Sequence, residues 1–197
     1  QFMHLAGIDI TKEPKEIGPT THYVMGGIRV DGDTQMSTVP GLFACGEVAA
    51  GLHGANRLGG NSLSDLVVFG KRAGEYAAKF AKENPKYVVD AKQADDAARA
   101  ALAPFDRPSS ADGPYQVQEA LQGSMQQNVG IVRLEDEMQL ALATIGELKK
   151  KTAKVHVRGN RDFNPGWHTA LDLRSLLTVA EAITRSAIER KESRGGH

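Results

Sequence analysis

The stretch from His53 to Leu63, His-Gly-Ala-Asn-Arg-Leu-Gly-Gly-Asn-Ser-Leu, holds the residue types best suited to bind an anion. It is a glycine-rich loop that runs directly into a helical pattern, so it presents unpaired N–H groups and the positive end of a helix dipole. A phosphate would suit this site, and so would the pyrimidine edge of a flavin. Arg57 adds a planar guanidinium that can hold a carboxylate through two hydrogen bonds. The alternative is a capped surface helix with a solvated arginine.

A second stretch places an acidic residue at the end of a short apolar run, Pro-Gly-Leu-Phe-Ala-Cys-Gly-Glu, residues 40–47. Gly46 allows the backbone to approach a ligand closely. The carboxylate of Glu47 could accept hydrogen bonds from two sugar-like hydroxyls, as on the ribityl chain of a flavin. The alternative is a strand that ends in a turn with a solvated glutamate.

The third stretch is His-Tyr-Val-Met-Gly-Gly-Ile, residues 22–28. His22 precedes a glycine pair that would permit a flat ligand to approach. A histidine can donate a hydrogen bond to a carboxylate or change protonation near neutral pH. A single histidine can equally be structural, so this stretch alone decides nothing.

Together and in this order, the three stretches resemble the flavoproteins of succinate dehydrogenase and fumarate reductase. The resemblance is most specific from about Pro19 to Gly74. It resumes at Asn160–Trp167 and at Glu192–His197, and the overall pattern is most similar to the actinobacterial type of succinate dehydrogenase.

The resemblance implies an enzyme that interconverts succinate and fumarate through bound FAD, with roles for specific residues. His22, Arg57 and Gly60 would bind the dicarboxylate. Residues that would hold or line the FAD are Tyr23, Gly46, Glu47, Asn61, Ser62 and Leu63.

The resemblance also implies parts that this sequence does not contain. The arginine that shuttles the proton is expected upstream, so no catalytic residue and no metal ligand is predicted here. Both ends look cut, and we expect a C-terminal fragment that is inactive alone. The expected partners are an iron–sulfur subunit and, through it, a membrane anchor, which would place the chain peripherally on the cytoplasmic face of a bacterial inner membrane.

The elements that must position these residues differ between two parts of the chain. Short apolar runs at residues 23–25, 28–30 and 42–45 predict strands, with a turn at Asp31–Asp33. Helical spacing predicts one helix over residues 62–82 with Asn61 as its N-cap. Further helices are predicted over residues 90–103, 115–127, 134–151 and 171–191, with a loop at 104–114 and an antiparallel packing of the later helices.

The predicted fold is therefore an α/β flavin-binding segment, part of an FAD-binding Rossmann-like domain, followed by an α-helical bundle. We place the first part at residues 1–88 and the second at 89–197. Trp167 is expected to anchor the helical part to the flavin-binding part. Lys+Arg and Asp+Glu are both 24, so net charge gives no reason to expect a nucleic-acid partner.

Two alternatives are weaker. An L-aspartate oxidase would share the fold, but it usually has Met-Ala-Ser where this chain has Leu58-Gly59-Gly60. A non-catalytic interaction module of the same fold would lack flavin altogether.

Overall fold

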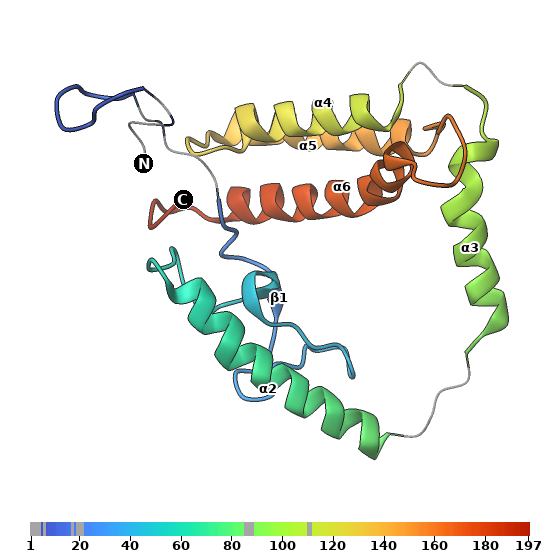
Figure 1. Cartoon of the computed structure of the whole chain (residues 1–197), viewed down its shortest axis with the longest axis horizontal. Coiled ribbons are helices and arrows are strands. Elements are labelled where there is room, and N and C mark those ends of the chain that lie inside the picture. The colour runs from blue at the N-terminus through green and yellow to red at the C-terminus, as the bar shows by residue number, and fades with distance from the viewer. Residues whose placement is uncertain (1–4, 6, 17, 19–21, 85–88, 110–111) are drawn as a thin grey trace.

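The computed structural model describes residues 5, 7–16, 18, 22–84, 89–109 and 112–197. Its helices form two groups, as Figure 1 shows: α2 lies with the irregular N-terminal part, while α4, α5 and α6 lie side by side. The predicted fold class is confirmed, since a short α/β segment precedes a helical bundle. The proposed division at residue 88 stays a prediction.

The strands are shorter than the sequence predicts. β1 (Ile28–Arg29) pairs in parallel with β2 (Ala49–Ala50), and an isolated antiparallel bridge joins Met36 to Phe43. Residues 23–25 form no strand; instead the Val24 N–H donates to a Glu47 carboxylate oxygen at 3.0 Å. The predicted turn is present, because Asp31 Oδ1 accepts from the Thr34 N–H at 2.9 Å and so closes it.

The first long helix, α2 (Asn61–Glu83), has the predicted extent but not the predicted cap. Gly60 is the N-cap, with φ 82° and ψ −25°, and no side chain caps the helix. The Asn61 prediction is wrong because the chain enters the helix through a left-handed residue, a conformation that glycine adopts without a Cβ penalty. At the far end of α2, Phe80 packs edge-on against Phe43 with ring centroids 6.1 Å apart.

The next helix, α3 (Ala91–Asp106), is capped by Asp90, whose side chain accepts from the N–H groups of Lys92 and Gln93. The sequence prediction ended this helix at residue 103, but it continues through Pro104. Pro104 is buried, and its carbonyl accepts a hydrogen bond from the Val157 N–H at 2.9 Å. This tertiary contact stabilises a last turn that the proline itself disfavours.

The bundle consists of α4 (Pro114–Asn128), α5 (Glu135–Thr152) and α6 (Pro165–Glu189), and successive helices run antiparallel (Figure 1). Helix α6 begins at Pro165, earlier than the predicted Leu171, because Pro165 is preorganised for a first helical position and Asn164 caps the Trp167 N–H at 3.1 Å. The main core joins all three helices and the segment after α5; its buried members are Val117, Leu121, Ile145, Leu148, Val155, Leu173, Leu177 and Ala180.

Trp167 contacts α3, and its predicted anchoring to the flavin-binding part stays a prediction. Its Nε1–H donates to the Ala101 carbonyl at 2.8 Å, and its ring lies 5.5 Å from the Phe105 ring. Both partners belong to α3, so Trp167 joins α3 to α6 within the helical part. Among the described residues, its aromatic-ring contacts and its indole N–H bond all lie within the helical part.

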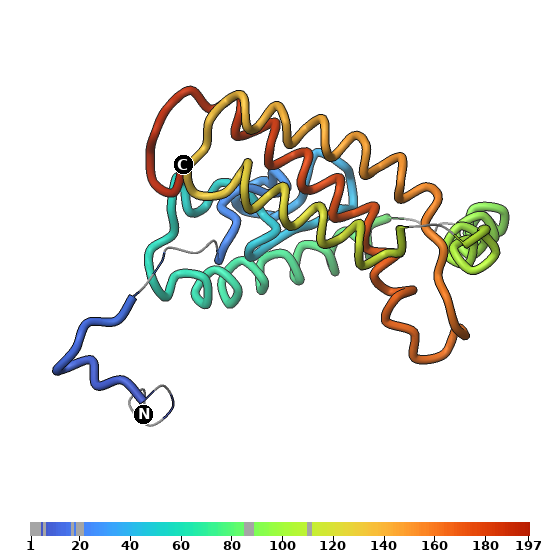
Figure 2. The backbone as a smooth tube through the Cα atoms, turned by 90° about the horizontal axis from the view of Figure 1, so that it is seen from above, coloured from blue at the N-terminus to red at the C-terminus, as the bar shows by residue number. Residues whose placement is uncertain are grey.

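The C-terminal residues return to the loop that precedes α2. The Gly196 N–H donates to the Ala55 carbonyl at 3.3 Å. The ring of His197 lies between Arg133 Nη1, 3.0 Å from Nδ1, and the Arg190 carbonyl, 3.1 Å from Nε2. Figure 2, viewed from above, shows the same approach of the C-terminus to the first half of the chain.

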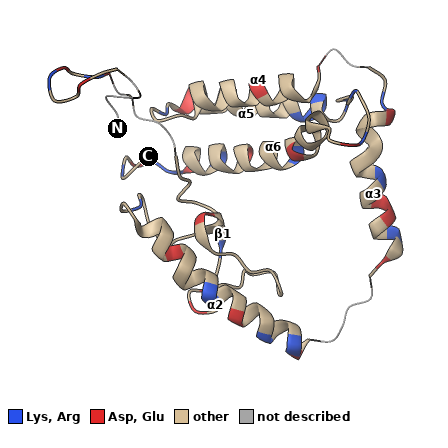
Figure 3. Ribbon diagram, in the orientation of Figure 1, with Lys and Arg blue, Asp and Glu red and all other residues tan. Residues whose placement is uncertain are grey.

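Lys and Arg are interspersed with Asp and Glu along the helices, as Figure 3 shows for α2 and α3. None of the described helices combines the length and the apolarity that a bilayer-spanning segment needs.

Candidate functional site

The structure brings together the segments that carry His22 and Arg57. Tyr23, the neighbour of His22, lies beneath the guanidinium of Arg57, whose Cζ is 4.7 Å from the ring centroid. The Tyr23 ring also meets the His53 ring edge-on, with centroids 5.6 Å apart. His22 itself is exposed. Thus two of the three predicted stretches share one face of the molecule.

Arg57 has hydrogen-bonding capacity to spare. Its Nη1 donates to the adjacent Leu58 carbonyl at 3.3 Å. Its Nε is buried and has no hydrogen-bond partner among the described residues. A buried donor without an acceptor costs free energy, and a ligand oxygen would remove that cost. A carboxylate is the natural acceptor, because the guanidinium is permanently charged and forked.

Glu47 connects the second stretch to the third. It belongs to the short 3-10 helix η1 (Gly46–Val48), and its bond to the Val24 N–H brings η1 beside the segment of Tyr23. Gly46 has φ 72°, a backbone conformation that favours glycine, and a Cβ there would lie 2.7 Å from Leu66 Cδ2. Glu47 therefore lies beside the segment that carries the predicted substrate residue His22.

The start of α2 faces open space. A Cβ added at Gly59 or Gly60 would meet no described atom within 4 Å. Asn61, Ser62 and Leu63 form the first turn of α2, and the Leu63 side chain is 69% exposed. A helix start that no side chain caps, beside an exposed apolar surface, suits a ring system with a polar edge. These residues therefore fit a flavin.

Asp65 lies beside the candidate site, and its sequence position does not reveal this. It is buried on α2, and its Oδ2 lies 3.3 Å from His53 Nε2, with side-chain exposures of 5% and 7%. The sequence offers one signal, an acidic residue within the apolar pattern of a helix.

The hydroxyl of Tyr23 also lies close to the His53–Asp65 pair, 3.5 Å from His53 Nε2. Burial raises the pKa of Tyr23 above 10.0, and the negative charges of Asp65 and Glu47 raise it further. The phenol is therefore protonated at neutral pH and acts as a neutral hydrogen-bonding group.

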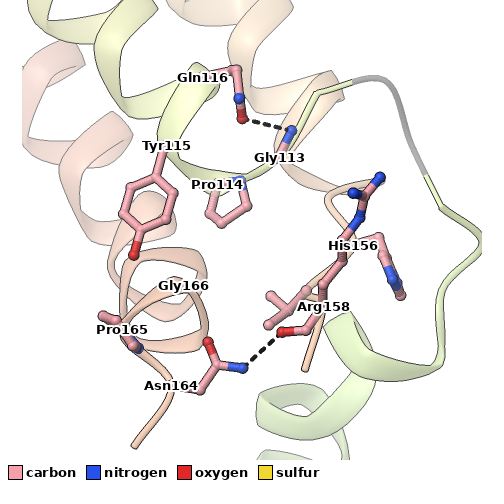
Figure 4. Close-up of a pocket in the computed structure, with 10 residues that line it drawn as sticks. Gly113, Pro114, Tyr115, Gln116, His156, Arg158, Asn164, Pro165 and Gly166 are labelled. Carbon is pink, nitrogen blue, oxygen red and sulfur yellow. Dashed lines mark hydrogen bonds between the residues drawn. The ribbon is translucent and has the colours of Figure 1, made fainter. Parts of the chain in front are cut away.

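Two cavities accompany these elements. One of about 470 Å³ borders Gly46 and Asp65, behind the start of α2. The other, of about 390 Å³, lies where α4 and α6 begin (Figure 4), between His156, Arg158 and Tyr115. The second cavity contains none of the predicted site residues.

Two family models match the chain. The model described as "FAD binding domain" matches residues 1–63, and the model described as "Fumarate reductase flavoprotein C-term" matches residues 118–197. The first match contains the site residues from His22 to Leu63, and the second covers most of the bundle.

Curated relatives agree with these matches. The chain is 41% identical over 196 residues to the fumarate reductase flavoprotein subunit of Haemophilus influenzae, covering 97% of this chain and 32% of the relative. It is 37% identical over 203 residues to the succinate dehydrogenase flavoprotein subunit of Coxiella burnetii, covering 98% of this chain and 35% of the relative. The chain thus spans about a third of the length of the curated relatives it matches.

Solved structures share the fold. The Mycobacterium smegmatis Sdh1 complex in the apo form matches with a TM-score of 0.91 and 53% identity, over 100% of this chain and 33% of that chain. An E. coli quinol fumarate reductase with an E245Q mutation in FrdA matches with a TM-score of 0.88 and 35% identity, over 99% and 34% of the two chains. The cofactor predicted from the sequence, FAD, is supported by the FAD-binding model and by the flavoprotein relatives. The chain belongs to the family of succinate dehydrogenase and fumarate reductase flavoprotein subunits.

Proposed function

We propose that this chain forms part of an FAD-dependent oxidoreductase that interconverts succinate and fumarate. The observation that carries the proposal is the half-buried guanidinium of Arg57, which has an unpaired Nε and stacks on the neighbour of His22. Arg57 would bind one carboxylate of the substrate, and the His22 imidazole and the Gly60 backbone would add hydrogen bonds. A dicarboxylate needs such cationic and donor groups around its ends.

The same face would hold the cofactor. Gly46, Tyr23 and Asn61 would line FAD, and Glu47 would bind its ribityl hydroxyls in addition to the Val24 N–H. Ser62 and Leu63 would face the ring from the start of α2, where the helix dipole favours negative charge. When bound, FAD exchanges a hydride with the substrate, and the chain's residues orient the substrate for that exchange.

None of the residues of this chain is assigned the proton transfer, which we expect from an arginine upstream. We further propose that an iron–sulfur subunit accepts the electrons and that a membrane anchor holds the assembly at the cytoplasmic face of a bacterial membrane. Support for this comes from the matched Sdh1 complex and quinol fumarate reductase.

The test uses the full-length flavoprotein that carries this chain. We expect a yellow protein with flavin absorption and succinate oxidation by a dye-coupled assay. A well-folded, colourless protein would favour the non-catalytic module. A yellow protein that oxidises L-aspartate and leaves succinate unchanged would favour an aspartate oxidase.

A further inference from the structure

A buried polar cluster lies directly behind the proposed dicarboxylate site. It consists of Asp65 on α2, His53 in the loop before α2 and Tyr23 in the first segment, and we name it the Asp65 cluster. His53 Nε2 is 3.3 Å from Asp65 Oδ2 and 3.5 Å from the Tyr23 hydroxyl.

Burying a carboxylate is costly unless it is paired and hydrogen-bonded. The side chains of His53 and Asp65 are both more than nine-tenths buried, so solvent contributes little to their pairing. The cluster therefore has few alternative arrangements and holds its three segments in one geometry.

Each member of the cluster belongs to a segment with a proposed site residue. Tyr23 follows His22, His53 shares its loop with Arg57, and Asp65 lies on the helix that begins beside Gly60. The link to Arg57 is direct, since its guanidinium stacks on the Tyr23 ring at 4.7 Å. A shift of Tyr23 would thus displace the guanidinium.

We propose that the Asp65 cluster positions Arg57 against His22 for dicarboxylate binding, with Asp65, His53 and Tyr23 as positioning residues. This inference rests on the proposed function and adds residues to it. None of the three needs to touch the substrate for this role. Misplacing a binding group by about 1 Å can lower the rate about 100-fold, so the effect of removing the cluster is measurable.

The first experiment compares Asp65→Asn with the wild-type FAD-loaded, full-length enzyme. Asparagine keeps the shape but loses the charge that pairs with His53. We expect the Kd for succinate, measured by calorimetry, to rise about tenfold or more, with FAD content unchanged. The matched control is Glu75→Gln, which removes an exposed carboxylate from the same helix, where Glu75 pairs only loosely with Lys71 at 3.4 Å. Its Kd should equal the wild-type value.

A graded pair of variants keeps the test decisive if Asp65→Asn does not fold. Tyr23→Phe retains the ring under Arg57 and should weaken succinate binding only a few-fold. Tyr23→Leu removes the ring and should weaken it about tenfold or more, measured on the FAD-loaded fraction because Tyr23 is also proposed to line FAD. A purely structural role would change the thermal stability of both variants and leave their succinate affinity equal.

The outcomes separate the two proposals. If Asp65→Asn, or both Tyr23→Phe and Tyr23→Leu, bind succinate with the wild-type affinity, the positioning role is overturned. The proposed function is not affected by that result. A wild-type flavoprotein that binds no succinate would overturn the proposed function and this inference with it.

Discussion

At the scale of single residues, the guanidinium of Arg57 matters for its shape as much as for its charge. It stacks on Tyr23, donates to the Leu58 carbonyl and still has a buried, unpaired Nε. Arg57→Lys keeps the positive charge but loses the fork and the flat stacking surface. A charged hydrogen bond contributes roughly 1.5–3 kcal/mol, so we expect kcat/KM for succinate to fall about 10- to 100-fold with FAD retained.

The control for this variant is Arg185→Lys on α6, where the arginine pairs with Glu181 at the surface. Exposed pairs of this kind contribute little, so its kinetics should match the wild type. Equal kinetics for Arg57→Lys in dye-coupled assays would exclude Arg57 from the substrate site.

The sequence named His22, Glu47 and Arg57 because each lies in a recognisable local pattern. It did not identify Asp65, because Asp65 is distinguished only by its pairing with His53. His53 lies in the loop before α2 and meets Asp65 only in the folded structure. In the sequence alone, a buried helical carboxylate cannot be distinguished from an exposed one. Local sequence patterns therefore point to candidate ligand-binding residues, but not to the buried partners that surround them.

At the scale of elements, helices were more predictable than strands: of the predicted strands, only the run at residues 28–30 forms one, as β1. The apolar spacing of α2, α4 and α5 fixed their extents to within a residue or two. The end of α3 was missed because a proline ends most helices, whereas Pro104 is held by the Val157 N–H. The run at residues 23–25 has strand-like composition, but a strand also requires a pairing partner, and among the described residues its Val24 N–H bonds to Glu47.

The C-terminal tail is an element whose contact with the loop before α2 can be tested at one glycine. Gly195 has φ 64°, and a Cβ there would lie 2.3 Å from the Ala55 carbonyl oxygen. Gly195→Ala would therefore combine a left-handed conformation, which costs about 1–2 kcal/mol for other residues, with a backbone clash. We expect the tail to leave the loop, and hydrogen exchange of residues 53–57 to become faster.

Gly196 provides a neighbouring control, because a Cβ at that position meets nothing described within 4 Å. Gly196→Ala also keeps the N–H that bonds to Ala55. Its exchange pattern should match the wild type. Slow exchange of the loop in Gly195→Ala would show that the tail does not stabilise it.

At the scale of the whole molecule, the flavin-binding part leaves apolar residues of its long helix exposed. Helix α2 leaves Leu63 at 69% and Val67 at 73% exposure. Exposed apolar faces of this kind mark surfaces that a ligand or another segment covers. FAD, or the further length found in the relatives, could provide such a cover.

The two core clusters of the bundle, in contrast, are formed by residues of the bundle itself. Every buried member of its two core clusters lies between Val117 and Ala187. We therefore expect residues 112–197, expressed alone, to fold into a helical unit with a cooperative thermal transition in circular dichroism.

In that unit Leu177→Ala should cost about 2–5 kcal/mol of unfolding free energy, because Leu177 is 1% exposed and its removal leaves a cavity. Leu176→Ala is the matched control: its side chain is 37% exposed, so the cost should stay below about 1 kcal/mol. A non-cooperative transition, or equal costs for the two variants, would mean that the bundle depends on the flavin-binding part for its fold.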